Sequence, residues 1–374
     1  MSFTNRPTVA IVHLDRLRHN AKLVLSKLGA GQEGMAIIKA NAYGHGSVMV
    51  ARTLEASGFK RFGVATLEEG LELRKQGIRS EIHILDGLIG NLSEYQSARL
   101  YPVIHTFEEL KLVAAYAADE NRDVLIDLKF DTGMGRLGFA AAQVDELMTI
   151  LRKAVFLRVQ CVLTHLARAD EPENETTIRQ YTLFRKLRDI LRERGLKEAR
   201  YSIVNSAALL DGRTEDFDWV RPGLCLYGAY PHVRLREAAE LKPVLELKTA
   251  ILAIKSVVPH TPIGYGGTFV TEKEAQIAIL PIGYADGYPR LLSNMGFVLV
   301  RGKRAPIVGR ISMDLTAVDV TGIPDVAVHD PVTLIGTDGV ETIHVEDVAK
   351  WAQTISYEIL CCLTARVPRL YQGL

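Results

Sequence analysis

Eight short runs of apolar and β-branched residues alternate with amphipathic helical segments between about residues 35 and 228. They recur at intervals of roughly twenty to forty residues, which is typical of βα units and a parallel sheet. Eight such units favour a closed (β/α)8 barrel of the TIM type over an open doubly wound sheet. The strands are expected at residues 35–39, 61–65, 81–85, 102–105, 124–129, 158–163, 201–204 and 219–221.

Two of the intervening helices carry their own start signal. Thr66 and Thr106 each precede a glutamate by three residues, which is the pattern of a capping box. The first of these helices also meets a stop signal at Gly77. The spacing predicts helices over residues 66–76 and 106–118.

The pattern changes after about Leu241, where β-branched runs are separated by glycine and proline turns. A chain of 374 residues usually exceeds one core, so a second domain is expected. We predict an α/β barrel over residues 13–240 and a mainly antiparallel β domain over 241–374, which the run 8–12 joins as a further strand. Strands are expected at 249–258, 276–280, 297–300 and 332–335, and helices at 345–354 and 357–363.

Composition excludes several classes of protein. The 45 Lys and Arg residues balance 44 Asp and Glu residues, and no basic face suggests nucleic acid. No apolar run approaches the length of a membrane span, and the N-terminal residues lack the apolar stretch of a signal peptide. The four cysteines show neither metal-ligand nor disulfide spacing, so we expect no metal and a cytoplasmic, reducing location. They are Cys161, Cys225, Cys361 and Cys362.

Lys39 stands at the end of the buried run 35–38 and begins the string KANAYGHG. A lysine there cannot easily reach bulk water, and desolvation disfavours its ammonium, which makes it a candidate amine for Schiff-base chemistry. The alternative for an isolated lysine is a side chain that extends to the surface. Tyr43 and the flanking glycines are expected in a loop that can approach an anion closely.

Other polar residues also follow predicted strands, and the carboxyl ends of the strands carry the active site in barrel enzymes. Ser206 at a helix start, with the backbone amides of Gly223 and Leu224, could hold a phosphate. A barrel lysine together with a phosphate site suggests pyridoxal phosphate. The residues that follow strands five to eight are Arg136, His165, Asn205, Ser206, Arg221, Gly223 and Leu224.

Nine strings occur in one order along nearly the whole chain. They are KANAYGHG at Lys39, LKFDTGMGRLG at Leu128, THLARAD at Thr164, NSAAL at Asn205, RPGLCLYG at Arg221, GYGGTF at Gly264, GYADGYPR at Gly283, GRISMD at Gly309 and SYEILC at Ser356. In these strings and their order the chain resembles the alanine racemases, pyridoxal-phosphate enzymes of fold type III. The resemblance implies interconversion of L- and D-alanine, which supplies D-alanine for peptidoglycan.

The resemblance also implies two bases. Lys39 would hold the cofactor and face the α-proton of D-alanine, while Tyr265 would face L-alanine from the opposite side. Racemisation requires this, because a proton leaves one face of a planar carbanion and another arrives on the other face. In the family the partner subunit supplies the tyrosine, which implies a homodimer with shared active sites.

Arg221 resembles the arginine that faces the cofactor's pyridine nitrogen in this family. Because an arginine pKa lies above 12, the ring nitrogen should stay unprotonated and form a weaker electron sink. This would suppress side reactions such as transamination. His165 would link Arg221 to Tyr265 by hydrogen bonds.

The remaining roles are likewise implied by the resemblance. Arg136 would contact the cofactor's phenolic oxygen and the substrate carboxylate, and the Met313 amide of the partner would add a second donor. Lys129 aligns with a lysine that is carbamylated in some members. The expected phosphate contacts are Tyr43, Ser206, Gly223, Leu224 and Tyr357, and the expected corridor for substrate comprises Asp170, Tyr284, Arg290 and Arg310.

The same residues allow four other interpretations. The glycines of GMGRLG form a GxGxxG, but no acidic residue follows at the distance that ribose recognition requires. An amino-acid decarboxylase of this fold should carry an acidic residue where Arg221 stands and a catalytic cysteine in the C-terminal part, where Cys361 and Cys362 are the cysteines present. A single-domain pyridoxal-phosphate-binding protein would lack the β domain and Tyr265. A serine or broad-specificity racemase remains open.

Overall fold

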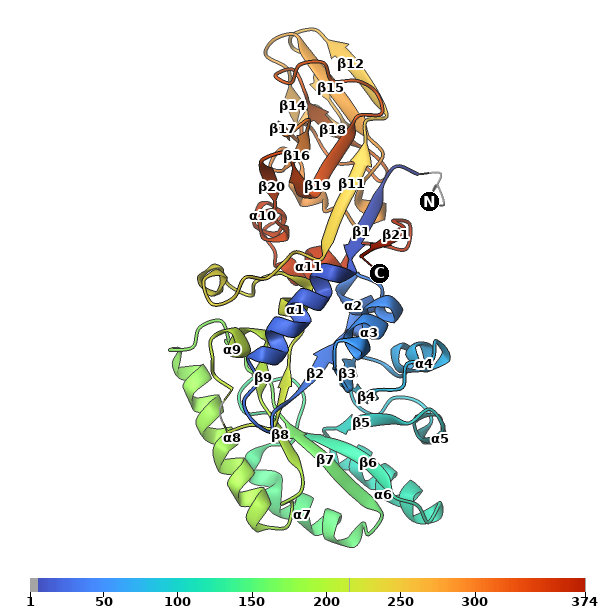
Figure 1. The fold of residues 1–374 in the computed structure, drawn as a ribbon, viewed down its shortest axis with the longest axis vertical. Coiled ribbons are helices and arrows are strands. Elements are labelled where there is room, and N and C mark those ends of the chain that lie inside the picture. Colours follow the sequence, from blue (N-terminus) through green and yellow to red (C-terminus); the bar gives the residue numbers. More distant parts are fainter. Residues whose placement is uncertain (1–5, 215, 374) are drawn as a thin grey trace.

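The computed structural model describes residues 6–214 and 216–373, and it forms a barrel with an elongated β domain above it (Figure 1). Nine parallel strand segments follow the order β8-β7-β6-β5-β4-β3-β2-β10-β9. Ile203 alone separates β8 from β9, so these two take the place of one predicted strand. The segments are β2 (Glu33–Ile37), β3 (Arg61–Val64), β4 (Glu81–Ile84), β5 (Leu100–Ile104), β6 (Val124–Lys129), β7 (Leu157–Leu163), β8 (Arg200–Ser202), β9 (Val204–Asn205) and β10 (Trp219–Arg221).

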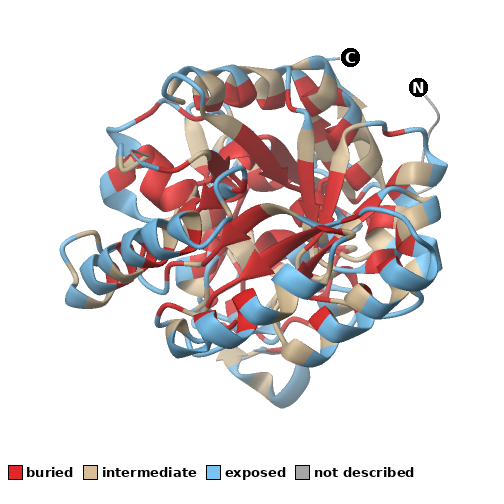
Figure 2. Ribbon diagram, turned by 90° about the horizontal axis from the view of Figure 1, so that it is seen from below, coloured by how far each residue is buried: buried red, intermediate tan, exposed pale blue. Residues whose placement is uncertain are grey.

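The predicted (β/α)8 barrel is therefore confirmed. Figure 2 shows the strands buried at the centre and the surrounding helices exposed on their outer faces. The helices are α1 (Leu14–Ser26), α2 (Lys39–Tyr43), α3 (Ser47–Ala56), α4 (Leu67–Lys75), α5 (Leu92–Ser97), α6 (Phe107–Asp119), α7 (Val144–Lys153), α8 (Glu175–Glu193) and α9 (Ser206–Leu210). Short 3-10 turns η1 (Ala141–Gln143), η2 (Leu224–Tyr227) and η3 (Val233–Arg236) accompany them.

Both predicted helix starts occur as expected. The Thr66 hydroxyl accepts the Glu69 amide at 3.4 Å at the start of α4. At α6 the box is complete, because Thr106 accepts the Glu109 amide at 3.2 Å and the Glu109 carboxylate accepts the Thr106 amide at 3.1 Å. These bonds satisfy amides that a helix start otherwise leaves without partners.

The C-terminal domain is mainly antiparallel, as predicted. Its largest sheet follows the order β17-β16-β19-β11-β1-β21, with β20 on β19, and the smaller sheets are β12-β15-β18 and β13-β14. The strands are β1 (Val9–His13), β11 (Leu245–Ala250), β12 (Ala253–Val257), β13 (Pro262–Ile263), β14 (Phe269–Val270), β15 (Ala275–Leu280), β16 (Phe297–Val300), β17 (Lys303–Pro306), β18 (Thr316–Asp319), β19 (Pro331–Asp338), β20 (Glu341–Ile343) and β21 (Arg369–Gln372). The helical elements are η4 (Tyr265–Gly267), η5 (Tyr284–Asp286), η6 (Arg290–Leu292), α10 (Val345–Trp351) and α11 (Ser356–Cys361).

The N-terminal strand β1 lies within this sheet. It pairs antiparallel with β11 and parallel with β21, so the first and last strands of the described residues both belong to the β domain. One expectation was wrong, because the predicted strand 249–258 is divided between β11 and β12. The chain leaves the large sheet after Ala250 and enters the smaller one at Ala253, where β12 pairs with β15.

One apolar core extends through both domains, and a small second cluster lies under the β13-β14 hairpin. All four cysteines are unpaired. Within residues 6–214 and 216–373, no helix combines the length and apolar character needed to cross a bilayer.

Candidate active site

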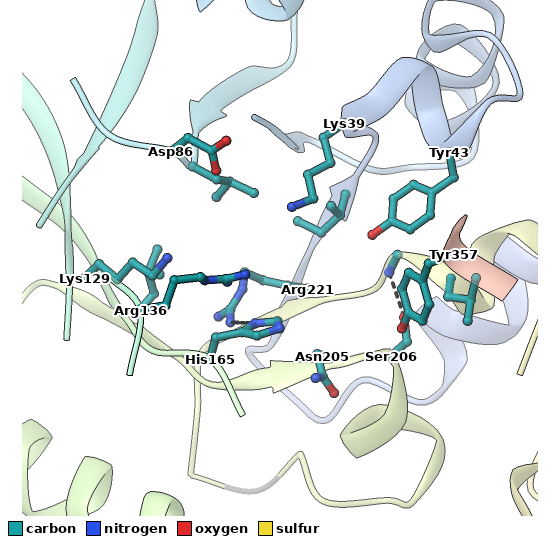
Figure 3. A pocket seen from close by; sticks show the side chains of 15 residues that line it. Lys39, Tyr43, Asp86, Lys129, Arg136, His165, Asn205, Ser206, Arg221 and Tyr357 are labelled. Carbon is teal, nitrogen blue, oxygen red and sulfur yellow. Dashed lines mark hydrogen bonds between the residues drawn. The ribbon is translucent and has the colours of Figure 1, made fainter. Parts of the chain in front are cut away.

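A hollow of about 200 Å³ lies at the carboxyl ends of the barrel strands (Figure 3). It brings together most of the residues that the sequence singles out. Four of its side chains are lysines or arginines, and only Asp86 among its lining residues is acidic. The lining comprises Ile37, Lys39, Tyr43, Leu85, Asp86, Lys129, Arg136, Leu163, His165, Asn205, Ser206, Arg221, Gly223, Leu224 and Tyr357.

Lys39 begins a left-handed turn rather than an open loop. Strand β2 ends at Ile37, two residues earlier than predicted, and residues 40 to 43 all have φ between 52° and 54°. Such a conformation costs about 1–2 kcal/mol for each residue that has a Cβ atom. The turn is held by the Glu69 carboxylate, which accepts the Ala40 amide at 2.6 Å, and by the Asn41 side chain, which accepts the Ser47 amide at 2.8 Å.

The Lys39 side chain is half-buried in the single chain. The expectation that this side chain cannot easily reach water was therefore wrong for the single chain. The strand ends before Lys39, and the lysine emerges into the open hollow instead of the packed barrel. Its ammonium nevertheless faces the pocket interior, as Figure 3 shows.

The turn after Lys39 is also packed against the β domain. Gly44 has φ 78°, and a Cβ there would overlap the Leu360 carbonyl oxygen of α11. At Gly46 a Cβ would overlap the Tyr371 hydroxyl. Arg369 donates from Nε to the Gly44 carbonyl at 3.0 Å. The two glycines therefore allow elements from the far end of the chain to approach the Lys39 turn closely.

Tyr43 and Gly223 lie side by side at one end of the pocket. A Cβ on Gly223 would lie 2.7 Å from the Tyr43 hydroxyl, so only glycine leaves room for this phenol. The Tyr43 ring packs on Tyr227 and Tyr357, with centroids 4.9 Å and 5.8 Å away. Burial raises the pKa of Tyr43 well above its usual value, so the hydroxyl stays protonated and can donate.

Ser206 begins the short helix α9 beside the same group. Its hydroxyl accepts the Gly223 amide at 2.8 Å, and the Asn205 side chain caps the helix by accepting the Ala208 amide at 3.1 Å. The Tyr43 and Ser206 hydroxyls and the Gly223 amide therefore lie close together at one end of the pocket. These donors, together with the space at Gly223 that a Cβ atom would fill, fit a phosphate group.

Arg221 is buried beneath the pocket. Its guanidinium donates to the Ser202 hydroxyl, to the Thr164 carbonyl at 2.5 Å and to His165 Nδ1 at 3.5 Å. Burial lowers the pKa of Arg221 to about 10, below the value above 12 expected from the sequence. The group still carries its charge at neutral pH.

His165 is a neutral imidazole. Burial, followed by the positive charges of Arg221 and Arg136, lowers the pKa of His165 to about 3. Because its Nδ1 accepts from a guanidinium, the ring carries its proton on Nε2, which is then the donor available to the pocket.

Lys129 ends strand β6 and is buried next to two arginines. Burial, followed by the charges of Arg136 and Arg221, lowers the pKa of Lys129 to about 8. A substantial fraction of the amine is therefore neutral near physiological pH.

Arg136 stands on a loop that wraps around a carboxylate. The Asp131 side chain accepts the backbone amides of residues 133 to 136 at 2.8–3.2 Å. Burial alone would raise the pKa of Asp131, but these four amides together lower it. The glycines of the GxGxxG string serve this turn, and a Cβ on Gly138 would lie 2.5 Å from the Asp131 amide nitrogen.

Apart from Tyr357, the site residues predicted in the β domain do not line this pocket. Tyr265, Met313 and Tyr284 are 71%, 53% and 44% exposed. The Tyr284 and Met313 loops are in contact, because the amides of Tyr284 and Ala285 donate to the Ser312 and Met313 carbonyls at 3.1 and 3.0 Å. The turn at Tyr265 lies against Arg310, since a Cβ on Gly264 would be 3.4 Å from the Arg310 amide nitrogen. The corridor residues Arg290 and Arg310 lie in this domain, whereas Asp170 lies in a barrel loop.

Sequence reasoning missed Asp86, Ser202 and the packing role of Tyr227. Asp86 follows the predicted strand 81–85, so the rule of strand ends could have found it. Ser202 was not identifiable, because its partner Arg221 lies on another strand. Within the described part of the chain, no group of three or more His, Cys, Asp or Glu side chains could hold a metal ion.

Comparison with known proteins follows the same division of the chain. Residues 12–231 match the family described as "Alanine racemase, N-terminal domain", and residues 244–371 match "Alanine racemase, C-terminal domain". An alanine racemase of Halothermothrix orenii is 42% identical over 376 residues, which cover 98% of this chain and 97% of that protein. One of Syntrophobacter fumaroxidans is 40% identical over 94% of each chain.

Solved structures are similar over the whole chain. The alanine racemase of Streptomyces lavendulae has a TM-score of 0.94 at 35% identity and covers 99% of this chain and 98% of its own. The Bacillus anthracis enzyme with bound L-Ala-P has a TM-score of 0.91 at 34% identity, with 100% and 96% coverage. The Bartonella henselae enzyme with covalently bound pyridoxal phosphate has a TM-score of 0.89 at 29% identity, with 98% and 99% coverage.

Proposed function

This chain belongs to the alanine racemase family, and we propose that it interconverts L-alanine and D-alanine with pyridoxal 5'-phosphate as cofactor. One observation carries the proposal: Lys39, buried Arg221 and the donors around Ser206 converge on one pocket. An amine and a phosphate site in one hollow are what this cofactor requires, and the fixed positive charge beside them matches the arginine expected at its ring nitrogen. A cytoplasmic location remains a prediction from the composition.

Different residues of the pocket would hold different parts of the cofactor. Lys39 would hold it covalently through its amine, and Arg136 would lie beside its phenolic oxygen. When bound, the cofactor supplies the conjugated ring that accepts electrons from the substrate α-carbon. Tyr43, Ser206, Gly223, Leu224 and Tyr357 would hold the phosphate, which is consistent with the hydroxyls and amides that meet there.

Arg221 would determine how strongly the ring withdraws electrons. Its charge is held in place by three acceptors, and it offers no proton to a neighbouring nitrogen at neutral pH. Arg221 would therefore leave a ring nitrogen beside it unprotonated, which would weaken the electron withdrawal and favour return of a proton to the substrate α-carbon.

Tyr265 would act as the second base in a homodimer. It lies outside the pocket of its own chain and is largely exposed, on a turn packed against Arg310. A partner subunit that presents this surface to the pocket would place a phenol opposite Lys39 and the Met313 amide near the substrate carboxylate. His165, with a donor at Nε2, would hydrogen bond to that phenol.

Lys129 is proposed to be carbamylated. Carbamate formation requires a neutral amine, and a pKa of about 8 provides one. The modification would replace a positive charge beside Arg136 with a negative one and would orient that arginine toward substrate.

A racemisation assay tests the proposal. The purified, cofactor-loaded chain should convert L- and D-alanine and act far less on serine and lysine, and borohydride treatment should leave a pyridoxyl group on a peptide that contains Lys39. A Lys39→Ala variant should lose both signals. Comparable rates with serine would favour a broad-specificity racemase, and no racemisation of any of the three amino acids would refute the proposal.

A further inference from the structure

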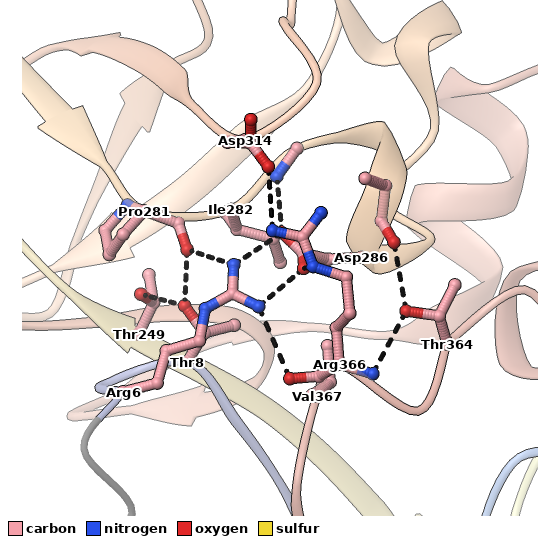
Figure 4. A network of polar contacts seen from close by, with 12 residues as sticks. Arg6, Thr8, Thr249, Pro281, Ile282, Asp286, Asp314, Thr364, Arg366 and Val367 are labelled. Carbon is pink, nitrogen blue, oxygen red and sulfur yellow. Dashed lines mark hydrogen bonds and ion pairs between the residues drawn. The ribbon is translucent and has the colours of Figure 1, made fainter.

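Four charged side chains form one chain of contacts across the β domain (Figure 4). Arg6 donates to both carboxylate oxygens of Asp286 at 2.6 and 2.7 Å. Arg366 lies 3.4 Å from the same carboxylate and pairs with Asp314 at 2.7 Å. The signs alternate along these residues, which we call the charge chain, so its net charge is zero.

Asp286 is the centre of the charge chain. Its side chain is fully buried and also accepts the Gly283 amide at 3.0 Å. Burial alone would raise the pKa of Asp286, but the bonds from Arg6 and Gly283 and the charge of Arg366 lower it. A buried carboxylate with this many donors can adopt only one position without a large electrostatic penalty.

The charge chain joins the two loops that carry exposed candidate site residues. Asp286 is the last residue of η5, which contains Tyr284, and Asp314 directly follows Met313. The backbones of these loops are already in contact, since a Cβ on Gly283 would overlap the carbonyl oxygens of Ser312 and Met313. Arg366 therefore ties together two segments that present Tyr284 and Met313 on the same surface.

The same C-terminal segment reaches the Lys39 turn. Thr364 donates from its amide to the Asp286 carbonyl at 3.1 Å and from its hydroxyl to the Ala285 carbonyl at 3.0 Å. Arg369 then donates to the Thr364 carbonyl at 2.5 Å and to Gly44 at 3.0 Å. The segment 364–369 is therefore hydrogen-bonded both to the loop that contains Tyr284 and to the turn after Lys39.

We propose that Asp286, Arg366 and Asp314 are positioning residues that hold the Met313 and Tyr284 loops for a substrate bound by the facing subunit. This inference rests on the proposed function and its dimer. It assigns the charge chain a role in alanine binding rather than in proton transfer, because none of its members lines the pocket.

Replacement of the Arg366–Asp314 pair can distinguish a role in loop positioning from a general role in folding stability. Its two side chains are 46% and 53% exposed, and ion pairs of that kind contribute little to folding. Loss of the pair should release the Met313 loop without unfolding the domain. Asp286 is less suitable for the test, because its removal leaves Arg6 without its bidentate carboxylate.

The experiment uses cofactor-loaded Arg366→Gln, Asp314→Asn and the double variant. The KM for alanine should rise about five- to ten-fold in each single variant while kcat changes less than about two-fold, and the double variant should resemble the singles. Hydrogen exchange should accelerate in peptides that cover residues 283–286 and 312–314. The matched controls are Arg304→Gln and Glu341→Gln, an exposed pair 2.9 Å apart in the same domain, which should change neither readout.

The results that would contradict this inference differ from those that would refute the proposed function. An active wild-type enzyme whose variants keep the KM and the exchange rates of the controls would overturn the inference and leave the proposed function intact. Multiplicative effects in the double variant would also overturn it, because independent residues do not form one positioning unit. A wild-type protein that does not racemise alanine would refute the proposed function and this inference together.

Discussion

Arg221 donates to His165 Nδ1 across 3.5 Å, and this contact ties a buried positive charge to a neutral imidazole. The guanidinium cannot serve as an acid for the cofactor, and the imidazole cannot accept another proton near neutral pH. In our proposal both groups therefore act by orientation and fixed charge, and Lys39 and Tyr265 transfer the protons.

Replacement of Arg221 tests the fixed charge. Arg221→Gln removes the charge and the donors to Ser202, Thr164 and His165, so racemisation should fall about 100-fold or more. Steady-state assays with L-alanine measure the loss, and pyruvate formation reports transamination. An exposed control, Arg304→Gln, should keep full activity. A variant at Arg221 that racemises within two- or three-fold of wild type would contradict the role.

Lys129 should make stability depend on pH in a defined direction. Its pKa of about 8 in the fold lies below its ordinary value of 10.5, so the folded state binds the proton less well than the unfolded chain. The penalty is fully present below about pH 8 and fades as the pH rises toward 10.5. A shift of this size corresponds to about 3 kcal/mol at most.

Lys129→Met should therefore stabilise cofactor-free protein by about 1–3 kcal/mol at pH 7 in buffer depleted of carbon dioxide. The gain should shrink between pH 8 and pH 9.5, as measured by urea unfolding of both proteins. A difference that stays constant over this range would show that packing, not protonation, separates the two.

Two glycines with similar backbone conformation test the packing on the Lys39 turn. Gly44 and Gly77 have φ 78° and 84°, but only at Gly44 would a Cβ overlap another element, while nothing lies within 4 Å at Gly77. Gly77→Ala should cost about 1 kcal/mol of stability, and Gly44→Ala about 3 kcal/mol or more. Thermal unfolding measures the stabilities, and titration with pyridoxal phosphate should show weaker binding only for Gly44→Ala. Equal effects would exclude a specific packing role.

Much of this structure could be predicted from local patterns. The eight strands alternate with helices. The starts of two of these helices, at Thr66 and Thr106, can be recognised from four consecutive residues. Because the carboxyl ends of barrel strands meet, their sequence positions alone place Lys39, Arg136 and Arg221 in one pocket.

The rest depends on contacts between distant segments. The left-handed turn at residues 40–43 is held by a hydrogen bond to Glu69, and α11 and β21 pack against it. No local sequence pattern predicts this turn. The pKa of Arg221 falls because of burial, which depends on the closed barrel. The place of Tyr265 relative to Lys39 involves a second subunit in our proposal, so one chain's sequence does not contain it.

Complementation of two inactive variants tests the shared site. If Tyr265 acts across the dimer, a mixed dimer of Lys39→Ala and Tyr265→Phe subunits contains one doubly defective site and one intact site. Random reassociation should restore about one quarter of wild-type activity, since about half of the dimers are mixed and each has one working site. No recovery in verified mixed dimers would mean that Tyr265 does not act in the partner's site.

The two-base assignment is tested most directly by the exchange of the α-proton of each alanine enantiomer in D2O with wild type and Tyr265→Phe. Removal of the phenol should slow exchange from L-alanine far more than exchange from D-alanine, since Lys39 still serves the second. Tyr116→Phe, a change on helix α6, should leave both rates unaltered. Equal slowing of the two enantiomers by Tyr265→Phe would contradict the account.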